Sequence, residues 1–365
     1  MTVPPTRVVR LGEARARYGA LTDALLPWLW VEDAPADAAA AVLRRDGWQG
    51  LGAALSGSDA VPPELRDLVD EVGSLPAWVD EARVRRAGRL FFRTGPIGGL
   101  VLGARSLVSG YCSPGGNKAL TMTGALQRDA NHRLAETGRF VAEVHREGGM
   151  RPGAEGWRIS ARVRIMHAQV RHLLHASGRW RAEDWGAPLN QHDLIATSLL
   201  FSVVWVDGVR RMGLRVTREE AEDHLHLWRW ISVVLGVQPT LPEDEDTARA
   251  MASLITLTQG TPDADARALV DALLGSGPGP TVGAGLCRAL LEPELADGLA
   301  LPRTRWRYLA EVARVVNAPL EVARWLHPAA ERGLVAAGEH YWEAAIRAGL
   351  GARGAQFAGP EALRG

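Results

Sequence analysis

The sequence is almost without lysine. Lys118 is the only lysine among 365 residues, so every other basic side chain apart from histidine is an arginine. Lysine and arginine together number 42, aspartate and glutamate also number 42, and the formal net charge is zero. A chain without net charge has no overall field that attracts nucleic acid. We therefore expect no nucleic-acid partner, and local concentrations of charge become informative.

Cysteine is also scarce. Cys112 and Cys287 are the two thiols, too few for a disulfide scaffold or a four-cysteine zinc site. No CxxCH sequence is present, which argues against covalent attachment of a c-type haem. The segment GYCSPGGN around Cys112 lacks the motif of a thiolate-ligated haem, so we expect a buried or semi-buried thiol.

Long apolar runs are absent. The start, MTVPPTRVVRLGEARARYG, has no apolar core of a signal peptide. The longest uncharged apolar run is Leu194 to Val206, between Asp193 and Asp207. It is shorter than the roughly 20 residues that span a bilayer, so it predicts a buried core helix rather than an integral membrane segment. A cytoplasmic location is the expectation.

Helix signals dominate what is present. Thr217 and Glu220 form a capping box that opens a helix ending at Gly236. Asn190 and Asp193 open the apolar helix through Trp205, and Ser177-Gly178 ends the helix before it. Thr261 and Pro262 predict a cap and first turn ahead of a helix ending near Gly275. Strand-like alternation is scarce, so the predicted class is all-α.

No interdomain linker or internal repeat is visible. We predict an N-terminal helical extension over residues 1–50, a single helical domain over 51–350 and a C-terminal tail over 351–365. The sequence does not indicate the oligomeric state.

The stretch RVRIMHAQVRHLLHASGRW, residues 162–180, is cationic with no acidic residue nearby: no carboxylate lies between Glu155 and Glu183. On a helix, Arg164, His167 and Arg171 form one stripe beside an apolar seam. A neutral imidazole is a common metal ligand, and guanidinium groups bind carboxylates. Haem b, with a central iron and two propionates, would satisfy all three residues. The alternative is a hydrogen-bonded core histidine between two solvated arginines.

The preceding segment, RDANHRLAETGRFVAEVHREGG, adds two candidates. Thr137 lies inside an apolar stripe, one turn after Arg133. If this helix faces the Arg164–Arg171 helix, Arg133 and Thr137 supply polar groups to one cavity. The alternative for Thr137 is a hydrogen bond back to its own helix.

Other histidines do not form a recognisable metal site. His172 and His175 lie on a different helix face from His167, and His224 and His226 are two residues apart. Neither a Glu-x-x-His pair nor a His-Glu-x-x-His motif is present. A non-haem metal is therefore a minor alternative.

Three motifs together resemble the rubber-oxygenase catalytic domain family, which includes latex-clearing proteins and an oxygenase of the mycophenolic acid pathway. They are Arg133–Thr137, the Arg-x2-His-x3-Arg triplet of 164–171, and Pro188–Leu194. The resemblance covers roughly Leu90 to Gly236 and extends less clearly beyond. It implies an all-α, globin-like helical core with additional helices, and haem binding in the domain 51–350.

The resemblance also implies roles for individual residues. His167 would be the axial ligand of haem b, and Arg164 and Arg171 would orient it. Arg133 and Thr137 would line the haem pocket. The reaction would use O₂ as co-substrate to oxidise or cleave a C=C bond, either as oxidative cleavage or as a tailoring oxidation in secondary metabolism.

Two positions depart from the family pattern. Asn117 stands where rubber-cleaving members have an acidic residue, and Glu136 stands where they have a lysine. Asn117 is a poor proton acceptor, so Glu136 becomes the candidate base, with a solvated helix residue as the alternative. Rubber is too large to enter a cell, so the expected substrate is small, apolar and unsaturated, isoprenoid- or polyene-like. A haem protein without oxygenase activity and a cofactor-free helical interaction protein remain open.

Overall fold

The computed structural model describes residues 3–46, 63–124, 130–275 and 279–351. Within these ranges every regular element is a helix, which confirms the all-α prediction. The predicted boundary at residue 50 and nearly all of the predicted tail lie outside the described residues. The division of the chain into an N-terminal extension and a single domain therefore stays a prediction.

The N-terminal part and the first half of the main body contain these elements in chain order: α1 (Leu11–Tyr18), α2 (Ala20–Leu25), η1 (Leu26–Trp30), α3 (Ala34–Asp46), α5 (Pro63–Gly73), α6 (Glu81–Arg93), α7 (Gly95–Val101), η2 (Leu102–Leu107), α8 (Val108–Tyr111), α9 (Lys118–Thr123), α11 (Ala130–His145) and α12 (Glu155–Ala176). Segment η2 is π-helical. Such wide turns often occur at functional sites.

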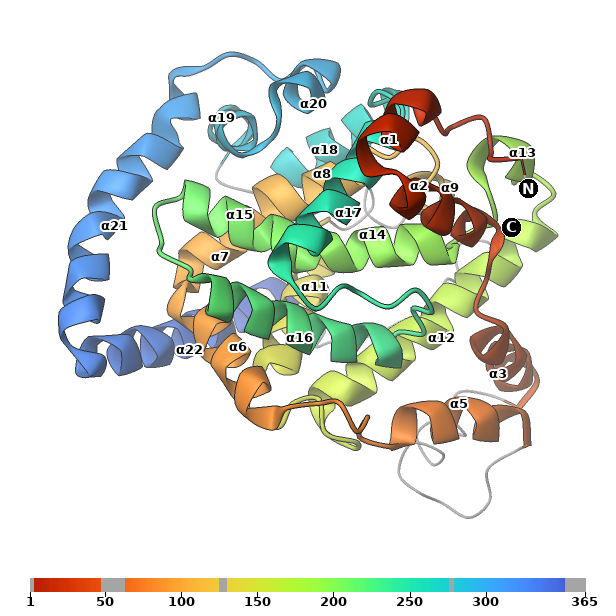
Figure 1. Cartoon of the computed structure of the whole chain (residues 1–365), viewed down its shortest axis with the longest axis horizontal. Helices are drawn as coiled ribbons and strands as arrows, with labels where there is room; N and C mark the ends of the chain where they lie inside the picture. Colours follow the sequence, from red (N-terminus) through yellow and green to blue (C-terminus); the bar gives the residue numbers. More distant parts are fainter. Residues whose placement is uncertain (1–2, 47–62, 125–129, 276–278, 352–365) are drawn as a thin grey trace.

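The second half continues with α13 (Ala182–Trp185), α14 (Gln191–Phe201), α15 (Val203–Arg211), α16 (Arg218–Val234), α17 (Glu245–Thr258), α18 (Ala264–Gly275), α19 (Pro280–Leu290), α20 (Pro293–Gly298), η3 (Arg305–Tyr308), α21 (Leu309–Leu326) and α22 (Pro328–Leu350). Figure 1 shows α1, α2, α3 and α5 along one side of the molecule and α21 along the opposite edge. Helices α14, α15 and α16 lie between these two sides.

The capping predictions are confirmed at two helices. Thr217 and Glu220 form both hydrogen bonds of the capping box at the start of α16. Asn190 accepts a hydrogen bond from the Asp193 amide at the start of α14. Gly236 follows the end of α16 with φ of 75°, a left-handed conformation that glycine adopts without the steric penalty of a side chain.

Two details of the helix prediction are wrong. The apolar run does not form one continuous helix, because Ser202 has φ −100° and ψ −95° and separates α14 from α15. The residues Gln191–Arg211 have the length and composition of a membrane span, but most of this stretch is buried inside the protein. Thr261 does not cap α18 either: Asp263 Oδ1 accepts the hydrogen bond from the Ala266 amide instead.

Candidate functional site

Helix α12 is held by a buried ion pair with the N-terminal segment. Arg164 Nε and Nη2 donate to the two carboxylate oxygens of Asp33 at 2.7 and 2.9 Å, and both side chains are 2% exposed. Arg164 Nη2 also donates to Glu71 at 2.9 Å. Asp33 is fixed in turn, since its carboxylate accepts from the Ala36 amide at the start of α3. A bidentate arginine–carboxylate pair is geometrically specific, so it sets the position of α12 relative to α3.

Arg171 makes the corresponding contact one helix turn beyond His167. Its Nε donates to Asp37 at 2.8 Å, and its Nη1 donates to the Leu189 carbonyl oxygen at 3.3 Å. The expectation that haem propionates neutralise Arg164 and Arg171 is therefore wrong. The missing negative charge comes from this chain, at Asp33 and Asp37, and the two arginines act on the site by positioning α12.

His167 lies between these two arginines and has no hydrogen-bond partner among the described residues. Its Nδ1 is buried without a partner. Burial, with the positive charge of Arg171 next in size, lowers the pKa of His167 to about 4. The imidazole is therefore neutral at neutral pH and keeps a lone pair. A buried polar nitrogen without a partner is costly unless something binds it.

His167 lines two adjoining cavities. The α11 cavity, of about 360 Å³, is bounded mainly by α11, α12 and α14, and its wall includes Arg133, Glu136, Thr137 and Met166. The α17 cavity, of about 280 Å³, lies between the η2–α9 segment, α14 and α17. The residues common to both walls are Leu107, Tyr111, Ala119, Leu120, His167, Leu189, Leu194, Thr197 and Phe201. His167 thus stands at the junction of two mostly apolar spaces.

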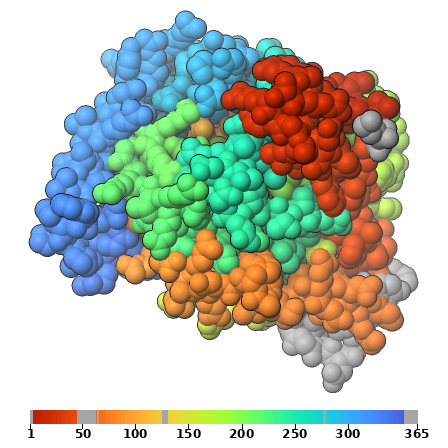
Figure 2. All heavy atoms as spheres, in the orientation of Figure 1, coloured from red at the N-terminus to blue at the C-terminus, as the bar shows by residue number. Residues whose placement is uncertain are grey.

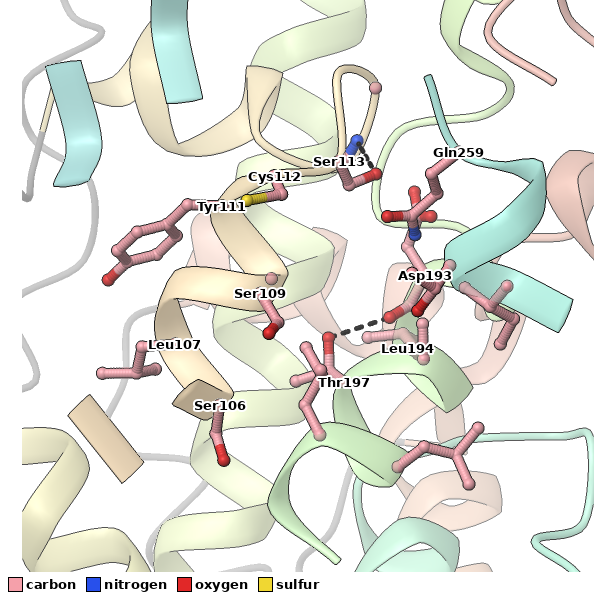
Figure 3. A pocket seen from close by; sticks show the side chains of 18 of the residues that line it. Ser106, Leu107, Ser109, Tyr111, Cys112, Ser113, Asp193, Leu194, Thr197 and Gln259 are labelled. Atoms are coloured by element: carbon pink, nitrogen blue, oxygen red, sulfur yellow. Dashed lines mark hydrogen bonds between the residues drawn. The ribbon is translucent and has the colours of Figure 1, made fainter. Parts of the chain in front are cut away.

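The charged side chain of Asp193 lies at one end of the α17 cavity. Figure 3 shows Asp193, Ser113 and Gln259 at that end, with Tyr111 and Leu107 at the other. Burial opposes ionisation of Asp193, but Arg7, whose Nη2 lies 2.9 Å from the carboxylate, and His192 together outweigh burial and lower the pKa to about 2. Asp193 is therefore a permanently charged anchor for the N-terminal segment.

The thiol and the phenol at this cavity are both unreactive at neutral pH. Burial raises the pKa of Cys112 to about 12, and burial likewise raises the pKa of Tyr111 to about 12. Metal ligation by cysteine requires the thiolate. The expectation of a buried or semi-buried Cys112 is confirmed, since the thiol is buried.

Helix α11 places Arg133 and Thr137, the two residues predicted from its sequence, on the wall of the α11 cavity. Thr137 Oγ1 donates to the Arg133 carbonyl oxygen at 2.9 Å, which is the bond back to its own helix that the sequence allowed. Arg133 Nη1 donates to Glu136 Oε2 at 2.8 Å. The structure therefore brings Arg133, Glu136, Thr137 and His167 to one cavity.

Glu136 is not a solvated surface residue. Its side chain is 4% exposed, and Oε1 accepts no hydrogen bond among the described residues, although His132 Nε2 lies 3.5 Å away. A buried carboxylate oxygen with a free lone pair is able to accept a proton. The geometry thus favours the interpretation of Glu136 as a functional residue.

Asn117 lies outside this group. Its Nδ2 donates to the Tyr111 carbonyl oxygen at 3.1 Å and to Asp263 Oδ1 at 3.0 Å. The neighbouring Lys118 forms ion pairs with Asp263 and Asp265. Asn117 therefore ties α9 to the start of α18 and is not among the described residues that line either cavity.

The described residues contain no group of three or more histidine, cysteine, aspartate or glutamate side chains placed to hold a metal ion. His172 and His175 lie on the outer side of α12, where His175 Nε2 is 2.8 Å from Glu32. His224 Nε2 contacts the Phe201 carbonyl oxygen, and His226 Nε2 accepts from the Asp80 amide. Each of these last two histidines has a structural partner of its own.

The sequence reasoning missed the acidic partners of the site. Asp33 and Asp37 lie 131 and 134 positions before the arginines they bind. Asp33 directly precedes α3 and Asp37 lies four residues later on the same side of its first turn, and Arg164 and Arg171 are seven apart on one face of α12. Spacings of four and seven residues each keep two side chains on one helix face, and this was the available signal.

Comparison with known proteins assigns the family. The model of the family described as "ER-bound oxygenase mpaB/B'/Rubber oxygenase, catalytic domain" matches residues 93–318. The chain belongs to this family. The match confirms the resemblance and extends it well past Gly236. It also includes every residue that the sequence assigned to the site, from Asn117 to Arg171.

Two relatives add detail. The rubber oxygenase of Streptomyces sp. (strain K30) is 27% identical over 235 residues, which are 62% of this chain and 56% of that protein. The chain thus spans little more than half the length of that relative. A solved structure of latex clearing protein in the closed state has a TM-score of 0.70 at 23% identity and covers 91% of this chain and 94% of that one. The two share their fold.

Proposed function

We propose that this chain is a haem b-dependent oxygenase that oxidises a small unsaturated substrate with O₂. One observation carries the proposal: the imidazole of His167 is neutral, has no partner among the described residues and stands on the wall of an apolar cavity. Family membership supports the same reaction class.

The cavity residues fit a haem better than a bare metal ion. A non-haem site needs several protein ligands, and the described residues hold no such cluster. A haem needs one axial ligand, apolar walls and a cation for its carboxylates. His167 would be the ligand, and Arg133, the one arginine among the described residues on the wall of the α11 cavity, would meet a propionate. Arg164 and Arg171 would keep α12 in place.

The other residues of the α11 cavity would have separate roles in the reaction. Haem supplies the capacity to bind and activate O₂, which no protein side chain has. Glu136 Oε1 would accept a proton from the substrate, and Arg133 would hold the other oxygen of that carboxylate. Thr137 lines the cavity with its methyl group available, because its hydroxyl is bonded to the helix. The mostly apolar walls exclude water from the reacting atoms.

The dimensions favour a small substrate. The α17 cavity, of about 280 Å³, is slightly smaller than the usual range of ligand sites, about 300–1,000 Å³. An isoprenoid- or polyene-like molecule fits its apolar lining, and an oxidisable C=C bond beside His167 gives either cleavage or a tailoring oxidation. The cytoplasmic location stays a prediction.

The first test is an absorption spectrum of protein produced with haem supplied. Wild-type protein is expected to show a Soret band, and His167→Ala is expected to lose or strongly shift it. His172→Ala, an exposed change on the same helix, is the matched control and should leave the band unchanged. Absence of the band from all three proteins would reject haem binding and favour a cofactor-free interaction protein.

A haem protein without oxygenase activity is the second candidate. The amide of Asn117 favours it, because a base at that position is absent and the side chain is bound to Tyr111 and Asp263. Oxygen uptake by the haem-loaded protein with a panel of short isoprenoids and polyenes separates the two. Substrate-dependent uptake supports the oxygenase, and a Soret band without uptake on any of them supports the second candidate.

A further inference from the structure

The outer face of α21 is apolar and exposed along its whole length. Val315 and Trp325 are 75% and 74% exposed, and the helix lies at the edge of the molecule (Figures 1 and 2). The exposed large apolar side chains of this face are Tyr308, Val312, Val315, Val316, Leu320, Val322, Trp325 and Leu326. Each of these eight side chains is at least 45% exposed, and a contiguous group of this kind is rare on a monomeric protein. A patch of this size marks an interaction surface.

The charges around this face are mostly positive. The exposed arginines between residues 303 and 332 are Arg303, Arg305, Arg307, Arg314 and Arg332. Glu311 is the one exposed acid in the same stretch. Arg303 has Asp297 at 3.6 Å, but Arg305 and Arg307 lie against the rings of Trp306 and Tyr308. The face therefore has an apolar centre and a cationic rim.

This charge pattern disfavours a second copy of the chain as the occupant. An antiparallel pair of α21 helices would bring Arg305 and Arg307 of one copy toward Arg332 of the other, and a parallel pair would bring each arginine toward its own equivalent. Like charges at the rim of an interface oppose association. An anionic lipid bilayer offers an apolar interior beneath a negative surface, and so complements both parts of the face.

We propose that the outer face of α21 is a peripheral binding surface for anionic membranes. Aromatic side chains near both ends of the face, Tyr308 and Trp325, suit the boundary between headgroups and acyl chains. The helix has 18 residues and carries Glu311, Arg314, Glu321 and Arg324, so it lies in the interface and does not cross it.

The cavities inside the protein extend toward the helices that α21 contacts. That a substrate uses them is a step that rests on the proposed function. A third cavity, of about 280 Å³, shares Leu107, Leu134 and Thr137 with the α11 cavity and reaches Tyr341. Its walls include parts of α19 and α22, two helices that α21 contacts. An apolar substrate that entered between α19 and α22 would thus lie next to the wall of the α11 cavity, on which His167 stands.

The test is flotation of the full-length protein with vesicles, without substrate. Vesicles of phosphatidylcholine with phosphatidylglycerol are compared with vesicles of phosphatidylcholine alone. Wild-type protein is expected to float with the anionic vesicles at least tenfold more than with the neutral ones, and added salt should release it. Val315→Glu and Trp325→Glu should each reduce flotation at least tenfold. Leu75→Glu, a similar change at an exposed leucine far from α21 in the sequence, should leave it unchanged.

Each contrary result has a definite meaning. No flotation of the wild type, or equal flotation of Val315→Glu, overturns the proposal. A stable wild-type dimer in light scattering that becomes monomeric in Val315→Glu, without flotation, assigns the face to a second copy instead. The exposed positions keep folding intact, which thermal denaturation checks. Because flotation needs neither substrate nor turnover, its outcome is separate from that of the haem proposal.

Discussion

Asp33 and Arg164 form a two-point ion pair that is almost fully buried, with nitrogen–oxygen distances of 2.7 and 2.9 Å. It joins the start of α3 to the middle of α12, one turn before His167. The residue that presents its imidazole to the cavities therefore depends for its position on a carboxylate outside the family match, which begins at residue 93. The N-terminal segment is part of the site's support.

Removal of the Asp33 carboxylate should strongly lower the free energy of unfolding. Asp33→Ala leaves a buried guanidinium with only Glu71 beside it, and breaking a buried pair costs about 3–5 kcal/mol in free energy of unfolding. Glu71→Ala is the matched control, because it removes a carboxylate from the same guanidinium but at a 43% exposed position. An exposed pair contributes about 0–1 kcal/mol. Urea denaturation measures both, and equal losses would contradict the central role of Asp33.

Gly236 is required by the same ion pair. A Cβ at this position would overlap Arg164 Nε and Asp33 Oδ2, in addition to the strain of an alanine at φ of 75°. Gly178 has a similar φ of 64° with open space around it, so Gly178→Ala isolates the backbone effect. We expect a loss of about 1 kcal/mol for Gly178→Ala from strain alone. Gly236→Ala should lose about 3 kcal/mol because overlap is added, and similar losses in urea denaturation would exclude the steric argument.

The placement of site residues within one helix could be predicted from the sequence. The contacts between helices that are distant in the sequence could not. Arg133 and Thr137, like Arg164, His167 and Arg171, lie within one helix each, where a period of 3.6 residues fixes their relative positions. Which carboxylates meet the arginines depends on how α3 packs against α12, and periodicity carries no information on that packing. The propionate hypothesis failed for this reason: the nearest acids in the sequence are not the nearest acids in space.

The same limit explains the errors in helix boundaries. Asn190 and Thr217 cap their helices through residues three positions away, so both caps were predictable from local sequence. The break at Ser202 was not, since its hydroxyl bonds to the Ser198 carbonyl oxygen and nothing in the apolar run signals a bend. The break between α14 and α15 at Ser202 therefore became visible only in the folded structure.

Stability should fall steeply in mild acid. Burial lowers the pKa of His224 and His167 to about 4, below the unfolded value of 6.5, and holds the pKa of His145 well below that unfolded value. The unfolded chain therefore binds protons that the folded chain rejects as the pH drops from 6.5 toward 4. Between pH 7 and pH 5 this amounts to about 2 kcal/mol for His224, and to the same for His167 in protein without haem.

Urea denaturation at pH 7 and pH 5 measures this loss, and one substitution isolates its source. His224→Phe should reduce the pH-dependent loss by about 2 kcal/mol, whatever it does to stability at pH 7. His340→Phe, at an exposed position, should leave the pH dependence as in the wild type. If His224→Phe keeps the full dependence, the buried histidines are not its source.

Glu136→Gln tests the proton acceptor on the α11 cavity. The amide keeps the shape of the carboxylate and its contact with Arg133, but it cannot take up a proton. If Glu136 Oε1 is the base, substrate-dependent oxygen uptake should fall by about 10²–10⁴-fold. The Soret band should persist, because His167 lies on another helix. Glu143→Gln changes a carboxylate on the same α11 that binds Arg146, away from the cavity, and should retain full activity. Retained activity in Glu136→Gln, with an unchanged pH profile, would leave the carboxylate a structural partner of Arg133 and move the search for the base to the α17 cavity.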